Sequence, residues 1–114
     1  VFAQIMNETG YLQFGGTVKP EQYNFCGLGA VSDEDAGLSF DDVRTGIRAE
    51  VQHLKGYACT TALNNTCVDP RFKYIERGVA PYVQYLGIQE NPNHKGWASN
   101  AGYGDLLMKI INSL

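Results

Sequence analysis

Long segments rich in glycine, proline and polar residues interrupt this chain, so only a few stretches can form regular secondary structure. Gly15-Gly16 and Lys19-Pro20 fall within 11–38, a stretch that predicts mainly loops and short turns. The stretch 56–80 also lacks helical periodicity, and Asp69-Pro70 predicts a turn inside it. We therefore expect short helices that are connected by long loops.

The two ends of the chain carry helical patterns. Val1 to Glu8 places apolar residues at positions 1, 2, 5 and 6, the stripe of an amphipathic helix, and Gly10 is its natural stop. Apolar residues at helical spacing also predict a last helix that starts between Tyr103 and Asp105. Pro81 opens a further short helix before it. The apolar residues of these last two helices are Val83, Tyr85, Leu86, Leu106, Leu107, Ile110, Ile111 and Leu114.

A central helix is predicted from about residue 39 to about Lys55. Ser39-Phe40-Asp41-Asp42 sets a hydroxyl at the expected N-cap and a carboxylate three residues later, which resembles a capping box. Gly46 within this helix indicates close packing against a neighbour. Val43, Ile47, Val51 and Leu54 recur at helical spacing, while Arg44, Arg48, Glu50 and Gln52 take other faces.

Length and composition limit the classes of protein that this chain can belong to. Its 114 residues fit one compact domain, 1–114, and no apolar run approaches the length that spans a bilayer. With a formal charge of −3, the chain lacks the excess of positive charge that is typical of nucleic-acid-binding domains, so we expect no nucleic acid partner. No signal peptide is present and the first residue is Val1, so we expect a processed or excised part of a longer chain.

The cysteines leave two possibilities open. Cys59 and Cys67 bracket a short polar loop and could close as a disulfide in an oxidising location, leaving Cys26 unpaired; alternatively, all three are reduced. The chain has no Cys-x-x-Cys pair and no clustered histidines, because His53 and His94 are isolated. We therefore expect neither a metal nor a cofactor.

Glu8 is the candidate acid of the first helix. It falls on the border of the apolar stripe, about one turn beyond Ile5, so its carboxyl is expected to be half buried. Burial penalises the charged form, and a carboxyl that stays protonated can donate a proton to a glycosidic oxygen. On spacing alone, a solvated residue at a helix end is the simpler interpretation.

Several motifs together carry a family resemblance. Phe2-Ala3-Gln4-Ile5-Met6-Asn7-Glu8-Thr9-Gly10, followed by Phe14-Gly15-Gly16 and Asn24-Phe25-Cys26-Gly27-Leu28, resembles the glucosaminidase family of peptidoglycan hydrolases, which includes bacterial autolysins and phage endolysins. The similarity covers nearly the whole chain. It continues through Asp42-Val43-Arg44-Thr45-Gly46, Gln52-His53-Leu54-Lys55, Val68-Asp69-Pro70-Arg71-Phe72 and Tyr103-Gly104-Asp105.

This resemblance implies a fold and two catalytic residues. The fold is an α+β, mainly α, lysozyme-like domain with a cleft between two lobes, and Glu8 is the catalytic acid. Tyr103 matches the family's tyrosine near the last helix; its hydroxyl would orient water or the substrate's N-acetyl group, unless the ring is only an aromatic staple. Family members usually carry further helices before the one with the acid, so we expect this chain to be either a fragment or a trimmed version of the fold that lacks those N-terminal helices.

The second carboxylate is less well defined. Asp33, Glu34 and Asp35 compete in a short lobe, and we choose Glu34 because its side chain reaches furthest; a merely solvated acidic turn is the other interpretation. Without such a partner, the substrate's own 2-acetamido group would supply the nucleophile.

The substrate-binding candidates are one amide and several aromatic residues. Asn24 and Gly27 match an Asn-x-x-Gly motif beside the family's cleft, where Asn braces a loop and Gly allows its turn. Tyr23 and Trp97, in polar contexts, are better candidates for stacking on sugars than Phe14, Tyr82 and Tyr85, since most aromatic residues are core. Arg44 and Arg48 could contact acidic peptide stems, although an exposed helix face is the simpler interpretation.

The resemblance therefore implies an enzyme that cleaves the β-1,4 bond after N-acetylglucosamine in peptidoglycan. It would act as a secreted or wall-associated bacterial protein or as a phage lysin, without membrane insertion; the oligomeric state stays open. Two alternatives remain. A lytic transglycosylase would form an anhydro product, but it typically has Ser after its Glu, where this chain has Thr9. A non-catalytic wall-binding module would retain only affinity for glycan.

Overall fold

The computed structural model describes residues 1–30 and 36–114, and its regular structure is helical. Within these ranges the chain forms no β-strand, only one parallel bridge between Gly87 and Ala98. The prediction of a mainly α domain is confirmed. The β part of the predicted α+β class is not seen, because the described residues form no strand. The helices are α1 (Phe2–Thr9), α2 (Val43–Ala58) and α3 (Tyr103–Ser113), with short 3-10 helices η1 (Pro20–Gln22), η2 (Phe72–Tyr74) and η3 (Val83–Leu86).

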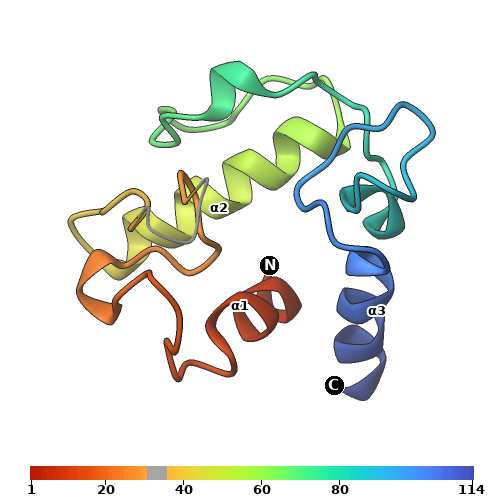
Figure 1. The fold of residues 1–114 in the computed structure, drawn as a ribbon. Coiled ribbons are helices and arrows are strands. Elements are labelled where there is room, and N and C mark those ends of the chain that lie inside the picture. Colours follow the sequence, from red (N-terminus) through yellow and green to blue (C-terminus); the bar gives the residue numbers. More distant parts are fainter. Residues whose placement is uncertain (31–35) are drawn as a thin grey trace.

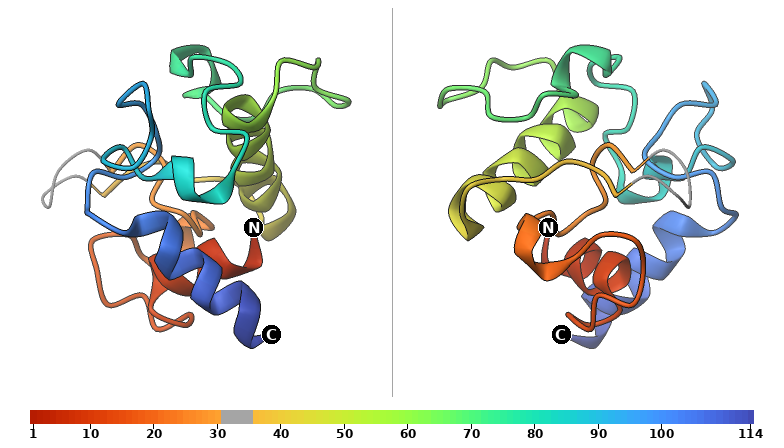
Figure 2. Two further views of the ribbon diagram at one scale, coloured as in Figure 1. Left: turned by 90° about the vertical axis from the view of Figure 1, so that its right-hand side faces the viewer. Right: turned by 60° about the vertical axis from the view of Figure 1, so that its left-hand side comes forward.

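The three α-helices enclose the middle of the molecule. α1 contacts α3, which also contacts η3, while α2 crosses above α1 (Figure 1). The segment that follows α2 runs along the side of that helix away from α1, in all three views (Figures 1 and 2). None of the helices among the described residues has the length and apolarity needed to cross a membrane.

α1 forms where its sequence pattern predicts, but Val1 and Phe2 of the predicted apolar stripe are exposed. It buries Ala3, Ile5 and Met6 and ends where Gly10 adopts a left-handed conformation with φ 60°. The backbone N–H of Tyr11 then donates to the Met6 carbonyl at 2.8 Å, which satisfies a carbonyl at the helix end. This stop leaves Glu8 in the last turn.

α2 begins three residues later than a cap at Ser39 would place it, so that prediction is wrong. The N-cap is Asp42, whose carboxylate accepts the backbone N–H of Thr45 at 2.7 Å. The residues before Asp42 are held elsewhere, because the backbone N–H of Phe40 donates to the Gln22 carbonyl at 2.8 Å. The helix also continues past Lys55, to Ala58.

The buried face of α2 is made of small and polar residues rather than of its regularly spaced apolar ones. Val43 and Val51 are exposed. The close packing predicted at Gly46 is confirmed, since a Cβ there would lie 1.8 Å from the carbonyl oxygen of Tyr23. Because Gly46 has no side chain, the Tyr23 backbone can approach α2 this closely, and this contact determines which side of the helix faces inward. The buried residues are Gly46, Ala49, Glu50, Gln52, His53 and Gly56.

Two apolar clusters form the core, and Trp97 packs against both. One centres on Leu86, Tyr103 and Leu107, and the other on Cys26, Leu28 and Ala49. Trp97 thereby links the C-terminal part of the chain to α2.

Residues 56–58 belong to α2, so the predicted irregular segment begins only at Cys59; from there to residue 80 it is irregular apart from η2, and Asp69 caps a turn by accepting the backbone N–H of Arg71 at 2.9 Å. Of the two possibilities for the cysteines, the structure has the reduced one. Cys26, Cys59 and Cys67 are all free; the Cys59 thiol lies 3.1 Å from the Thr61 hydroxyl, and the Cys67 thiol donates to the Asp69 carbonyl.

Candidate active site

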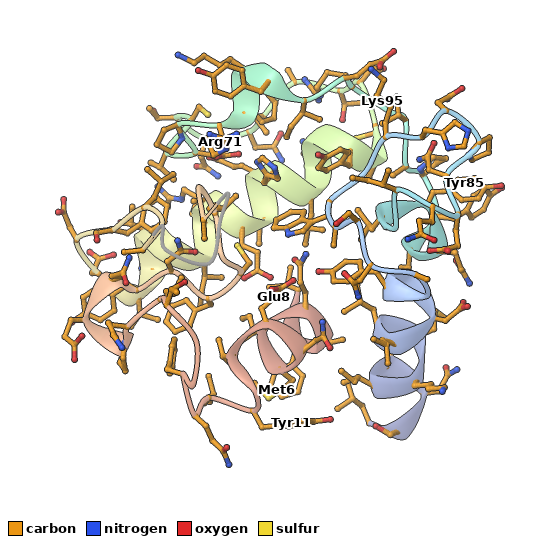
Figure 3. All side chains as sticks on the ribbon, viewed as in Figure 1. Met6, Glu8, Tyr11, Arg71, Tyr85 and Lys95 are labelled. Carbon is orange, nitrogen blue, oxygen red and sulfur yellow. The ribbon has the colours of Figure 1, made fainter. Side chains whose placement is uncertain are left out.

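A cavity of about 580 Å³ opens where the end of α1, the loop after it and the segment before α3 meet. Glu8 and Thr9 line it from α1, Asn24 to Gly27 from the loop, and Trp97 to Asn100 from the other side. The stick view shows Glu8 projecting from α1 toward the space below α2 (Figure 3). Because its walls come from segments far apart in the sequence, the cavity is not visible in any local pattern.

Glu8, Tyr103 and Gln4 form a hydrogen-bonded chain across α1 and α3. The Tyr103 hydroxyl donates to Oε1 of Glu8 at 2.6 Å and accepts Nε2–H of Gln4 at 3.0 Å. Tyr103 is only 2% exposed, so its ring is fixed by packing as well. The structure therefore brings together Glu8 and Tyr103, two of the three residues that the sequence analysis put forward as catalytic.

The carboxyl of Glu8 holds its proton more strongly than an ordinary glutamate. Although Glu8 is exposed to the cavity, surrounding protein displaces much of the water near its carboxyl, and this desolvation raises its pKa. The hydrogen bond from Tyr103 acts in the opposite direction and is the smaller effect. Burial and the Glu8 charge raise the pKa of Tyr103, so that its hydroxyl remains a neutral donor.

Glu50 is a buried acid close to the site that the sequence analysis did not single out as functional. It is 0% exposed, and both carboxyl oxygens are buried without a hydrogen-bond partner. Burial raises its pKa to about 8; the Val1 ammonium lowers it and the charge of Glu8 raises it further. The available signal was the small residues Gly46 and Ala49, which share its face and mark that face as buried.

The aromatic candidates separate into two groups. Phe14 and Trp97 line the cavity, whereas Tyr23, which the sequence analysis preferred to Phe14 for stacking on sugars, does not. Tyr23 lies against α2, with its carbonyl packed under Gly46. Trp97 stands edge-on to the His53 ring at 4.7 Å, and Phe14 stands edge-on to Phe25 at 6.2 Å.

Asn24 braces the loop that faces Glu8. Its side-chain amide donates to the carbonyls of Leu28 and Leu38, and its Oδ1 accepts the Leu28 N–H at 3.0 Å. With 1% exposure and both amide hydrogens used, Asn24 supports the cavity wall, which fits the bracing role better than direct binding. Gly27 has φ 71°, and a Cβ there would approach Oε2 of Glu8 to 3.8 Å.

The three acids proposed for the second carboxylate, Asp33, Glu34 and Asp35, lie outside the described residues. Ala30, which precedes this gap, lines the cavity.

Within 1–30 and 36–114, no group of three His, Cys, Asp or Glu side chains is placed to hold a metal ion. His53 instead pairs with the buried Asp69 carboxylate at 2.6 Å.

Comparison with known proteins connects this chain to a family of glycosidases. The family model Glucosaminidase, described as mannosyl-glycoprotein endo-beta-N-acetylglucosaminidase, matches residues 1–114. A protein of Borreliella burgdorferi, itself described as uncharacterized, is 39% identical over 113 residues, covering 99% of this chain and 52% of that protein. The chain thus spans about half the length of this curated relative. No solved structure matches the chain.

Proposed function

The chain belongs to the Glucosaminidase family, and on that basis we propose that it hydrolyses the β-1,4 bond after N-acetylglucosamine in peptidoglycan, with Glu8 as general acid. The observation that carries this proposal is the Glu8 carboxyl, which borders a cavity, has its pKa raised by burial and accepts a hydrogen bond from Tyr103. We propose that residues 1–114 form one catalytic domain with a lysozyme-like cleft, which acts at the cell wall as a secreted enzyme or a phage lysin.

The geometry assigns different tasks to the two oxygens of Glu8. The Tyr103 hydroxyl donates to Oε1, which leaves Oε2 to carry the proton on the side that faces Gly27. Oε2 would protonate the glycosidic oxygen as the C1–O bond breaks through an oxocarbenium-like transition state. The ionised Glu8 would then accept a proton from the attacking water, which restores the acid for the next cycle.

The group that stabilises the positive charge at C1 is proposed separately. Glu34 remains our candidate, with Asp33 and Asp35 behind it, and the substrate's 2-acetamido group is the alternative. Glu50 is not that group, because its carboxyl is fully buried and does not line the cavity. Phe14 and Trp97 are proposed to stack on sugar rings, since both line the cavity.

Product analysis tests the proposed reaction. Purified peptidoglycan is incubated with the protein, and the soluble fragments are analysed by mass spectrometry and by the identity of their reducing ends. Fragments that end in reducing N-acetylglucosamine are expected. Reducing N-acetylmuramic acid would overturn the bond specificity, and anhydro ends, lighter by one water, would identify a transglycosylase. Glycan binding by a folded protein without any release would leave only a binding module.

One structural observation bears on the transglycosylase alternative. The hydroxyl of Thr9, which follows Glu8, donates to the Ile5 carbonyl at 2.7 Å and accepts the Leu12 N–H at 2.8 Å. This hydroxyl is therefore committed to closing α1, not to the substrate. The product analysis therefore separates the two reactions.

Replacing Tyr103 with Phe is expected to move the alkaline limb of the pH profile of kcat/KM to higher pH. The hydrogen bond from Tyr103 lowers the pKa of Glu8, so its removal lets Glu8 stay protonated over a wider range. The maximal rate should fall, because Oε1 loses its orienting donor. The profile is measured with soluble glycan, and the exposed Tyr82, replaced by Phe, is the control. A limb that stays in place or moves to lower pH contradicts the assigned contact.

A further inference from the structure

A second hollow lies on the outward side of α2, away from the buried face that carries Gly46, Ala49 and His53. Its volume is about 330 Å³, and it shares no lining residue with the cavity at Glu8. We call it the α2 groove. The helix contributes residues at i, i+3, i+4, i+7, i+8 and i+11, the positions that share one face. The lining residues are Arg44, Ile47, Arg48, Val51, Gln52, Lys55, Leu63, Asn64 and Asn65.

The groove is held open by hydrogen bonds between α2 and the loop that forms its other wall. Lys55 Nζ donates to the Ala62 carbonyl at 2.8 Å, and Gln52 Nε2 donates to the Thr66 carbonyl at 2.9 Å. Gln52 Oε1 also accepts the Val68 N–H at 2.8 Å. Both ends of the wall 62–66 are therefore tied to the helix, so the groove exists before any ligand arrives.

The floor of the groove is apolar and its rim is cationic. Val51 is 43% exposed there, beside Ile47 and Leu63. Arg44 and Arg48 form no ion pair within the described residues, although the chain as a whole carries a net charge of −3. A positive strip over apolar side chains, on an acidic protein, suits an anionic ligand that also presents small apolar groups.

We propose that the α2 groove binds the peptide stems of peptidoglycan; this inference rests on the proposed function for the identity of the substrate. The carboxylates of a stem would pair with Arg44 and Arg48, since a guanidinium forms bidentate contacts with a carboxylate. Alanine side chains of the stem would cover Ile47 and Val51. The amides of Asn64 and Asn65 match the donors and acceptors of an extended peptide backbone. A phosphodiester polymer would match the charge but leave the apolar floor uncovered.

The position of the groove sets its role. Because it lies on the far side of α2 from Glu8, a stem bound there does not enter the cavity in which a glycosidic bond would be cleaved. The groove therefore retains the protein on the peptide-bearing wall network, and it is not needed for cleavage of glycan strands that carry no stems.

The test measures binding without cleavage, in the Glu8→Gln background, by co-sedimentation with insoluble peptidoglycan freed of phosphate polymers. Arg44→Gln/Arg48→Gln is expected to weaken this binding about fivefold to tenfold. Val51→Asp, which adds a carboxylate to the floor, should produce a similar loss. Lys73→Gln/Lys109→Gln removes two exposed cations elsewhere and should bind like the parent. Removal of the stems by an amidase also removes the cross-links, so the resulting glycan strands are immobilised on beads for the same measurement, and all variants should bind them equally.

Each other result overturns the inference. Unchanged binding of the arginine variant to intact peptidoglycan excludes the groove, and an equal loss on stem-free strands excludes the stem as its ligand. A loss that appears only while phosphate polymers remain attached identifies those polymers instead. Because the assay requires no turnover, a protein that fails the product analysis can still show stem-dependent binding, and an active one can lack it.

Discussion

Glu8→Gln is expected to lower the rate of glycan release by about 10²-fold to 10⁴-fold, because the amide of Gln cannot donate a proton to the leaving oxygen. The change is nearly isosteric, and the side-chain oxygen of Gln can still accept the Tyr103 hydroxyl that Oε1 now accepts. The fold and the cavity should therefore persist. The measurement is the initial rate at which new reducing ends appear from peptidoglycan.

Two comparisons make this prediction specific to the acid. Glu21→Gln makes the same change on η1, at an exposed position outside the cavity, and should leave the rate unchanged. The free energy of unfolding of each variant shows whether a loss of rate reflects a loss of fold. If Glu8→Gln retains the rate within a few-fold, another group donates the proton and the proposed mechanism fails.

Sequence reasoning located Glu8 and its helix because the signals are local. The apolar pattern of α1 and the stop at Gly10 lie within ten consecutive residues; the helix and its stop are formed as predicted, and Ile5 and Met6 are buried, whereas Val1 and Phe2 are exposed. The contact that orients the carboxyl is not local, since Tyr103 is 95 residues away from Glu8. Resemblance to a family brought Tyr103 forward, but periodicity could not have paired the two side chains.

The orientation of α2 shows what apolar spacing alone misses. Spacing favours Val43 and Val51, yet the structure leaves both exposed and buries Glu50 instead. The Tyr23 carbonyl packs so closely against Gly46 that this face of α2 must point inward. Steric fit therefore determines the orientation of α2 more than the spacing of its apolar residues does. With this face of α2 turned inward, Val51 lies in the α2 groove and Glu50 lies behind the candidate site.

Glu50→Gln is expected to remove a large pH dependence from the free energy of unfolding. In the folded protein Glu50 has a pKa of about 8, above its ordinary value of 4.5, which it should recover in the unfolded chain. Between these two values the folded state binds a proton that the unfolded state has lost, so the free energy of unfolding falls as pH rises. The slope is up to about 1.4 kcal/mol per pH unit.

This sign determines where wild type and variant should differ. Below about pH 4.5 Glu50 is protonated in both states, so its contribution is fully present and the neutral Gln should give nearly equal stability. Above that, wild type should weaken progressively until about pH 8, where Glu50 ionises in the folded state, while the variant keeps its stability. Chemical denaturation across this range measures the difference, with Glu21→Gln as control.

The electrostatic interaction between Glu8 and Glu50 leads to a further expected result for the pH dependence of stability. The charge of Glu8 raises the pKa of Glu50, so in a Glu8→Gln background the loss of stability should level off at a lower pH. Glu50→Gln itself should retain glycan release, because Glu50 does not line the cavity and is already neutral below about pH 8. A stability difference that is the same at every pH would mean that Glu50 ionises as readily in the folded protein as in the unfolded chain.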